Sequence, residues 1–373
     1  MPSNLNRLLI AWASSLILVV GGVLLMEATY TPPGPDAENQ PVSDQNADTP
    51  DDTATAAQDQ APPTTDPSGT DAPAAATSPA SDIPAPGQPP ATNNQASQVS
   101  AIPQGLPIQP IQDLMEQSND GPLPKIAADG RKSYDIYAAP RISDRSLSRI
   151  AILVTDLGKK ARNTKRAIDD LPANVSLGFS VYGSNLHEWG QQARAKGHEV
   201  FLAVPMEPVN YPQNDPGPLT LLTDMSTRTN LSLLRSSLSK FSGYAGVVNY
   251  MGSRFTAAPE SIRPILDELK RRGLMFIDNR DSRYSRAASQ AQGINMPWAV
   301  NNGYVDDNLD AENIASQLNE LEKRARAQRT ALGIARSYPV TIQAIKVWAA
   351  TLEERGFSLV PVTSIAGQQA LPR

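Results

Sequence analysis

The alternation of short apolar runs with longer polar segments, from Arg149 to Val362, constrains the fold of this chain more than any other feature. The first run, RIAILVTD, is almost continuously apolar, which is typical of a strand buried on both faces of a parallel sheet. We predict strands at 149–156, 174–183, 199–206, 244–251, 274–278, 331–336 and 357–362. We predict helices between them at 159–171, 185–197, 229–241, 260–273, 311–328 and 341–356.

About seven such units in an α/β chain leave two architectures, a closed parallel barrel or an open doubly wound sheet. The loop after the first strand, TDLGKKARN, has a single glycine and contains neither a dinucleotide fingerprint nor a phosphate-binding P-loop. A barrel places its site at the carboxyl ends of its strands. Polar residues follow the predicted strands at Asp156, Glu207, Asn249, Asp278 and Asp306. We therefore predict a distorted, incomplete (β/α) barrel, with an irregular portion between Asn279 and Asp306.

The amino terminus carries a segment long enough to span a membrane. Leu8 to Met26 is 19 residues without a charge, which as a helix extends roughly 28 Å. Arg7 precedes it and acids follow it, so residues 1–30 are predicted to be a cytoplasmic tip and a single-pass anchor in a bacterial-type inner membrane. The rest of the chain would then lie in the periplasm or outside. A cleaved signal peptide is the alternative, but the run exceeds a usual signal core and no Ala-x-Ala site follows it.

Residues 31–100 contain ten acidic residues and no Lys or Arg, and are rich in Pro, Ala, Asp and Thr. Such a composition cannot bury enough apolar surface to fold, so we predict a disordered linker. Residues 101–147 are predicted to be an irregular arm that packs on the barrel through Tyr134, Ile136 and Tyr137. The main domain is predicted at 148–367 and a tail at 368–373.

The available side chains limit the chemistry. The chain has no cysteine and only two histidines, His187 and His198, which excludes a thiolate nucleophile and a Cys-ligated zinc site. His187 lies in a predicted helix, and His198 precedes a strand at the end of the barrel opposite the expected site. Both are interpreted as surface or structural residues. The basic clusters KKARNTKR and EKRARAQR are interpreted as solvated helix faces, so no nucleic-acid partner is predicted.

Several motifs together resemble one family. ILVTDLG, VPMEP, NDPGPLTL, NYMGSRFTA, FIDNR and VDDN occur in this order over residues 148–367. They resemble the divergent polysaccharide deacetylases, a NodB-like family of distorted (β/α) barrels. The resemblance implies a hydrolase in which an Asp and two His hold a divalent metal, zinc. The metal-bound water would attack an N-acetyl group of a polysaccharide, and a second Asp would act as base.

The residues at the family's catalytic positions differ in this chain. Thr155 stands beside Asp156 where the family has two adjacent acids, and Ala203 stands where a His precedes the PMEP motif. Tyr250 replaces the His of the Asn-His-Met-Gly-Ser motif, and Ala335-Arg336 replaces a Gly-His pair. Asp156 is left as a vestigial metal ligand or base. We therefore expect a degraded metal site and no bound cofactor.

Three functions fit these residues. A rearranged deacetylase would use the carboxylates of Asp156, Asp278 and Asp306, with Asp307, around Mg²⁺ or Mn²⁺. A non-catalytic module would bind N-acetylated envelope polysaccharide in a groove. A partner-binding module would contact another envelope protein. For substrate binding, the sequence indicates Glu207, Asn249, Tyr250, Ser253, Arg254 and Trp298.

The anchor prediction can be tested by cell fractionation. Because Leu8 to Met26 is followed by no cleavage motif, we expect the mature protein to keep residue 1 and to sediment with membranes. The measurement is amino-terminal mass spectrometry of the mature chain together with immunoblots of the fractions. A soluble mature form that begins near Tyr30 would contradict the prediction.

Overall fold

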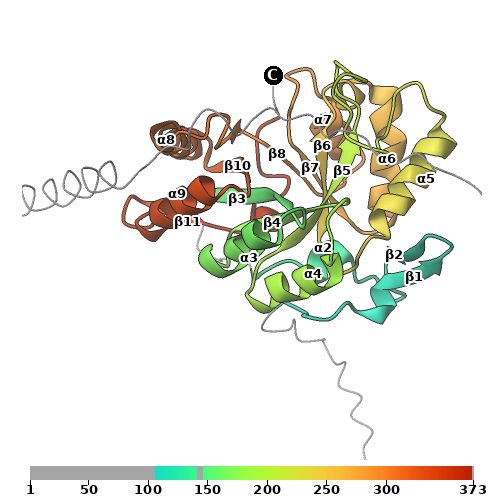
Figure 1. Cartoon of the computed structure of the whole chain (residues 1–373), viewed down its shortest axis with the longest axis horizontal. Coiled ribbons are helices and arrows are strands. Elements are labelled where there is room, and N and C mark those ends of the chain that lie inside the picture. Colours follow the sequence, from blue (N-terminus) through green and yellow to red (C-terminus); the bar gives the residue numbers. More distant parts are fainter. Residues whose placement is uncertain (1–105, 141–145, 372–373) are drawn as a thin grey trace, which may run out of the picture. The chain divides into compact units, whose positions relative to one another are not determined.

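The computed structural model of the protein describes residues 106–140 and 146–371, all of them in one compact unit of the chain (Figure 1). Within these ranges no helix is long and apolar enough to cross a membrane. The predicted anchor at 8–26 and the predicted linker at 31–100 lie outside the described residues.

Nine strands form one parallel sheet: the seven that the alternation of the sequence predicts, with β8 and β9 in addition. Their order is β8-β7-β6-β5-β4-β3-β10-β9, and β11 pairs with the beginning of β3. The strands are β3 (Ser148–Leu157), β4 (Ser176–Ser180), β5 (Val200–Met206), β6 (Gly246–Met251), β7 (Met275–Asp278), β8 (Trp298–Val300), β9 (Gly303–Tyr304), β10 (Thr330–Arg336) and β11 (Phe357–Leu359). The α/β class and the curled, distorted barrel are therefore confirmed.

The two ends of the sheet meet at a two-residue link. β8 and β9 are at opposite ends of the strand order, yet only Asn301 and Asn302 separate them in the chain. The Asn302 N–H donates to Leu332 O at 2.8 Å, and its side-chain oxygen accepts from Leu332 N at 2.8 Å. On the other side, the Gln369 amide exchanges hydrogen bonds of 2.7 and 2.8 Å with the backbone of Val300. Amide side chains therefore continue the ladder where backbone pairing stops.

Alternation along each strand separates two layers of core. In β3, Ala151 and Leu153 belong to the inner cluster, whereas Ile150, Ile152 and Val154 belong to the cluster that includes the helices. Successive side chains of a strand point to opposite faces, and both faces are covered here, so the strand is apolar throughout. The same alternation decides which polar residues near the strand ends face the interior.

Helices surround the sheet on its outer side (Figure 1). They are α3 (Ala161–Asp170), α4 (Leu186–Ala195), α5 (Thr227–Leu238), α6 (Pro259–Arg271), α7 (Ala287–Gly293), α8 (Ala311–Gln328) and α9 (Pro339–Ala350). Two differences from the sequence prediction concern boundaries. The last helix ends at Ala350 and not near Gly356, and the portion predicted as irregular contains α7, β8 and β9. Both β8 and β9 are very short, so they carry little periodic signal.

The amino-terminal arm lies against the amino ends of the strands. It contains η1 (Gln112–Leu114), the hairpin of β1 (Met115–Ser118) and β2 (Gly121–Pro124), and α2 (Ser133–Ile136). The Ala139 N–H donates to the Glu199 carboxylate at 3.0 Å, just before β5, and the Tyr134 N–H donates to Gly273 O at 3.0 Å, just before β7. Tyr137 is buried with the inner cluster. This end of the barrel is therefore closed by the arm.

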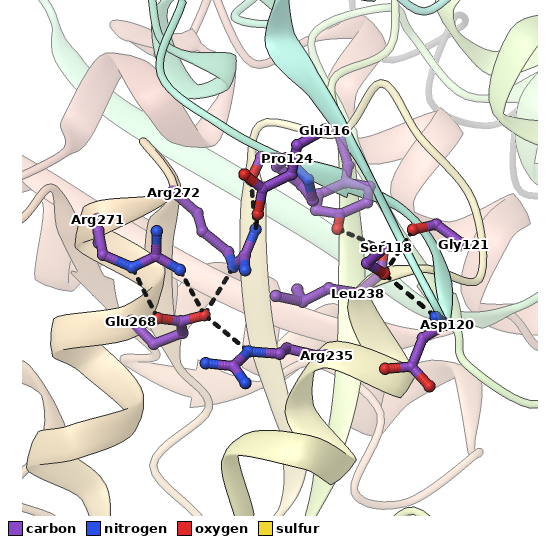
Figure 2. A network of polar contacts seen from close by, with 11 residues as sticks. Glu116, Ser118, Asp120, Gly121, Pro124, Arg235, Leu238, Glu268, Arg271 and Arg272 are labelled. Atoms are coloured by element: carbon purple, nitrogen blue, oxygen red, sulfur yellow. Dashed lines mark hydrogen bonds and ion pairs between the residues drawn. The ribbon is translucent and has the colours of Figure 1, made fainter.

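A charged network joins the hairpin to the end of α6 (Figure 2). Arg272 contacts Glu268 at 2.8 Å and Glu116 at 2.8 Å, and it donates to Pro124 O at 2.8 Å. Burial by itself raises the pKa of Glu268, but Arg271, Arg272 and Arg235 together lower it to about 2. The carboxylate is therefore ionised at neutral pH and holds the guanidinium groups in place.

Substitution of Arg272 tests this attachment. Arg272→Ala leaves the buried Glu268 carboxylate and Pro124 O without their shared donor, so we expect a loss on the order of 3 kcal/mol in the free energy of unfolding. The control is Arg263→Ala, which removes an exposed pair with Asp267 on the same helix and should change the value by less than about 0.5 kcal/mol. Urea unfolding followed by circular dichroism measures both, and equal small losses would show that the network does not hold the arm.

Candidate functional site

A pocket of about 400 Å³ lies at the carboxyl ends of the strands, opposite the arm. It brings together the four positions at which the sequence departs from the family pattern, namely Thr155, Ala203, Tyr250 and Arg336. The other lining residues are Asp156, Val248, Asn249, Met251, Asn279, Asp281, Tyr304, Asp307, Ile334 and Tyr338. The four departures come from four different strands, so the sequence changes converge on one place.

Asp156 reaches the pocket through an irregularity in β3. The register between β3 and β4 shifts between Val154 and Leu157, and Asp156 has a φ of 64°. A bulge at the end of a strand re-aims a side chain, and such left-handed backbone is typical of functional sites. The Asp156 carboxylate contacts Lys159 Nζ at 2.7 Å, and the same ammonium lies 4.6 Å from the centre of the Tyr250 ring. Asp156 therefore faces a cation supplied by the chain itself.

Two asparagines shape the floor of the pocket. Asn249 Nδ2 donates to Met251 O at 2.6 Å, and its oxygen accepts from the Asn279 N–H at 2.9 Å. Met251 has a φ of 56°, an unusual conformation for a residue other than glycine. The buried amide of Asn249 thus stabilises the turn after β6. Asn249 therefore has a structural role, and its role in ligand binding stays a prediction.

Glu207, in the PMEP motif, clamps two loops together. One carboxylate oxygen accepts from the Thr223 N–H and hydroxyl at 2.6 Å each, and the other contacts Arg254 at 3.0 Å. Ser253 Oγ accepts from the Val209 N–H at 3.0 Å. Neither Glu207 nor Ser253 lines the pocket. Glu207 is buried, which corrects its interpretation as a substrate-binding residue, whereas contact of the partly exposed Ser253 with a ligand stays a prediction. Arg254 also lies outside the pocket lining but is exposed, so its contact with a ligand stays a prediction.

The carboxylates of Asp278 and Asp306 are buried away from the pocket, which corrects their interpretation as catalytic or metal-binding groups. Asp278 follows Ile277, whose side chain belongs to the inner cluster, so the Asp278 side chain points to the outer face of the sheet. There its carboxylate accepts hydrogen bonds from Ser285 Oγ at 2.7 Å and from the Arg280 N–H at 2.9 Å. Asp306 accepts from the Arg336 N–H at 2.8 Å and Thr341 Oγ1 at 3.0 Å. Burial raises the pKa of each carboxyl. Asp306 is therefore a positioning group for Arg336.

Trp298 is not a stacking residue of the pocket. Its side chain is 2% exposed and packs with the outer core between sheet and helices. The neighbouring Ala299 takes the inner position of β8. Because successive residues of β8 point to opposite faces of the sheet, Trp298 points away from the pocket, and its predicted stacking role is wrong.

The sequence interpretation missed four polar lining residues: Asn279, Asp281, Tyr304 and Tyr338. Tyr304 OH donates to Asp281 at 2.6 Å, and Asn279 Nδ2 donates to the other oxygen of Asp281 at 3.0 Å. Tyr338 follows β10 by two residues, beyond Arg336. Their position after strand ends was a usable signal, but Tyr304 lies in the portion that was predicted to be irregular.

The donor set of the pocket does not fit the zinc site that the family resemblance implies. A hydrolytic zinc takes three protein ligands, usually imidazole or carboxylate groups. Among the described residues, no group of three or more His, Cys, Asp or Glu side chains could hold a metal ion. His187 is exposed on α4, and His198 is buried beside Val175 O at 2.8 Å and Ile168 O at 3.1 Å. The oxygen-only magnesium or manganese site is not formed either, because Asp278 and Asp306 face elsewhere.

Comparisons of the sequence and of the fold found similar proteins. The chain is 24% identical over 198 residues to the uncharacterized protein YibQ of Escherichia coli K12, and spans 61% of the length of that relative and 53% of its own. An uncharacterized protein of Haemophilus influenzae is 24% identical over 212 residues, which is 56% of this chain and 73% of the relative. The crystal structure of the uncharacterized protein ATU2773 from Agrobacterium tumefaciens C58 matches with a TM-score of 0.64 and 36% identity. That match covers 66% of this chain and 99% of the other.

The family model described as divergent polysaccharide deacetylase matches residues 152–366, more than half of the chain. This range includes most of β3, the strands from β4 to β11, the pocket and the four altered positions. The protein therefore belongs to the divergent polysaccharide deacetylase family, with pocket residues that differ from the metal-binding pattern.

Proposed function

We propose that this protein binds polysaccharide in the pocket at the carboxyl ends of its strands and does not hydrolyse N-acetyl groups with zinc. The observation that carries the proposal is the convergence of Thr155, Ala203, Tyr250 and Arg336 on one pocket of about 400 Å³. This volume lies within the range of small-ligand sites, roughly 300–1,000 Å³. The pocket keeps the place of a family active site but presents tyrosine, amide and guanidinium groups.

The lining side chains suit a sugar. Tyr250, Tyr304 and Tyr338 supply aromatic faces for the apolar side of a pyranose ring, and their hydroxyls and the amides of Asn249 and Asn279 are hydrogen-bonding groups. Two of the charged groups are already held by neighbours, Asp156 by Lys159 and Arg336 by Asp306. Such pre-organised side chains lose little freedom when a ligand binds.

We further propose that the protein acts in the bacterial envelope, anchored by the segment from Leu8 to Met26. The support is the sequence alone: an uncharged run of 19 residues followed by an acidic, proline-rich stretch. The partner would then be an N-acetylated or partly deacetylated envelope polysaccharide, or an envelope protein bound together with it.

Binding can be measured by titration calorimetry on the full-length protein in detergent, with partially N-acetylated glucosamine hexamers as the probe. Tyr250→Ala removes an aromatic face of the pocket, and we expect affinity to fall on the order of tenfold, which corresponds to about 1.4 kcal/mol. Tyr284→Ala is the matched control, because Tyr284 is exposed and does not line the pocket. If the hexamer does not bind, or if both variants bind like the wild type, the proposed function is wrong.

The absence of zinc chemistry has its own test. We expect purified protein, dialysed against zinc, to hold far less than one equivalent by elemental analysis and to release no acetate from N-acetylated hexamers. Tyr250→His should not restore activity, because one imidazole beside Asp156 still leaves the metal short of ligands. Stoichiometric zinc, with acetate release that Asp156→Asn abolishes, would overturn the non-hydrolytic proposal.

A further inference from the structure

The charges around the pocket do not balance. Four carboxylates line it or are paired with its lining residues: Asp156, Asp281, Asp306 and Asp307. Two cations accompany them, because Lys159 pairs with Asp156, and Arg336 with Asp306. Asp281 and Asp307 form no ion pair with any residue that the structure describes. The pocket therefore carries a net negative charge on the side where these two residues lie.

Both carboxylates act on the same phenol. Tyr304 OH donates to Asp281 at 2.6 Å. Burial raises the pKa of Tyr304 above its usual value, and the charges of Asp281 and Asp307 raise it further. The phenol thus stays a neutral donor, and both carboxylates line the same pocket as Tyr304.

Each carboxylate has unused capacity to accept hydrogen bonds. Asp281 accepts one bond on each oxygen, from Tyr304 and Asn279, although an ionised carboxylate has about four acceptor sites. Asp307 is exposed, and its carboxylate has no hydrogen bond to the described part of the chain. A ligand with several N–H donors and a positive charge would satisfy both.

The aromatic groups of the pocket already attract cations from the protein. Lys159 lies 4.6 Å from the centre of the Tyr250 ring, and the Arg336 guanidinium lies 5.4 Å from that of Tyr338. A cation over an aromatic face is attracted by the electron-rich centre of the ring. These two aromatic faces are therefore occupied by cations of the chain itself, and the unpaired carboxylates of Asp281 and Asp307 remain the groups of the pocket that an added cation can contact.

We propose, on the basis of the polysaccharide-binding function above, that the preferred ligand is a glycan with free primary amino groups, whose ammonium binds at Asp281 and Asp307. An N-acetyl group is neutral and has one N–H, so it cannot compensate two carboxylates. A primary ammonium has three donors and a positive charge. The pocket would thus distinguish deacetylated from acetylated amino sugars.

The test compares two hexamers of equal length, one of glucosamine and one of N-acetylglucosamine, by calorimetry with the full-length protein at a pH at which the amines are protonated. We expect the glucosamine hexamer to bind at least tenfold more tightly. Asp307→Asn should remove most of this preference by weakening the binding of the glucosamine hexamer. Asp307 suits the test because no described contact depends on it, so the variant should fold.

The matched control is Asp224→Asn, which neutralises another exposed aspartate outside the pocket and should keep the wild-type preference. Equal binding of both hexamers, unaffected by Asp307→Asn, would overturn the amine preference while polysaccharide binding stands. Binding of neither hexamer would overturn both. A lysine hexapeptide that binds as tightly as the glucosamine hexamer would show that the pocket recognises amines without a sugar, and would overturn the assignment to a glycan.

Discussion

The short link of Asn301 and Asn302, which joins the two ends of the curled sheet, is the constraint on which the other features depend. A parallel sheet that stayed open would leave unpaired backbone groups at β8 and β9 and would separate the strands that carry the pocket. The link places one edge beside the other, and the amides of Asn302 and Gln369 replace the missing ladder bonds. Because the strands then surround one interior, the carboxyl ends of β3, β5, β6 and β10 face a common space.

Within that frame, the alternation of the strands decides the role of each polar residue. Thr155 and Arg336 continue the inner series of Leu153 and Ile334, so they line the pocket. Asp278 directly follows the inner residue Ile277, so its side chain is buried on the outer face of the sheet. A carboxylate at the end of a strand is therefore a candidate ligand group only if its position matches the inner series or if an irregularity of the strand re-aims it, as at Asp156.

The sequence predicted the strands and helices well, because their apolar periodicity is strong and the family motifs cover the whole domain. The sequence interpretation failed for strands that are too short to show a period and for contacts between residues far apart in the chain. The three residues of β8 and two of β9 have no measurable period, and as a result Trp298 was interpreted as a pocket residue. The pairing of Glu207 with Thr223 and Arg254 joins residues far apart in the chain, so the sequence could identify the motif but not its structural use.

The geometry also explains why the pocket can exist without the family's metal ligands. A metal ion often organises the loops that bind it, and its loss then exposes uncompensated carboxylates. Here Glu207 joins the loops after β5 and β6, and Asn249 holds the turn at Met251, so the loops have their own hydrogen bonds. Lys159 supplies a positive charge next to Asp156. Shape and charge at this position are therefore maintained by the chain, and the remaining carboxylates are available for a ligand.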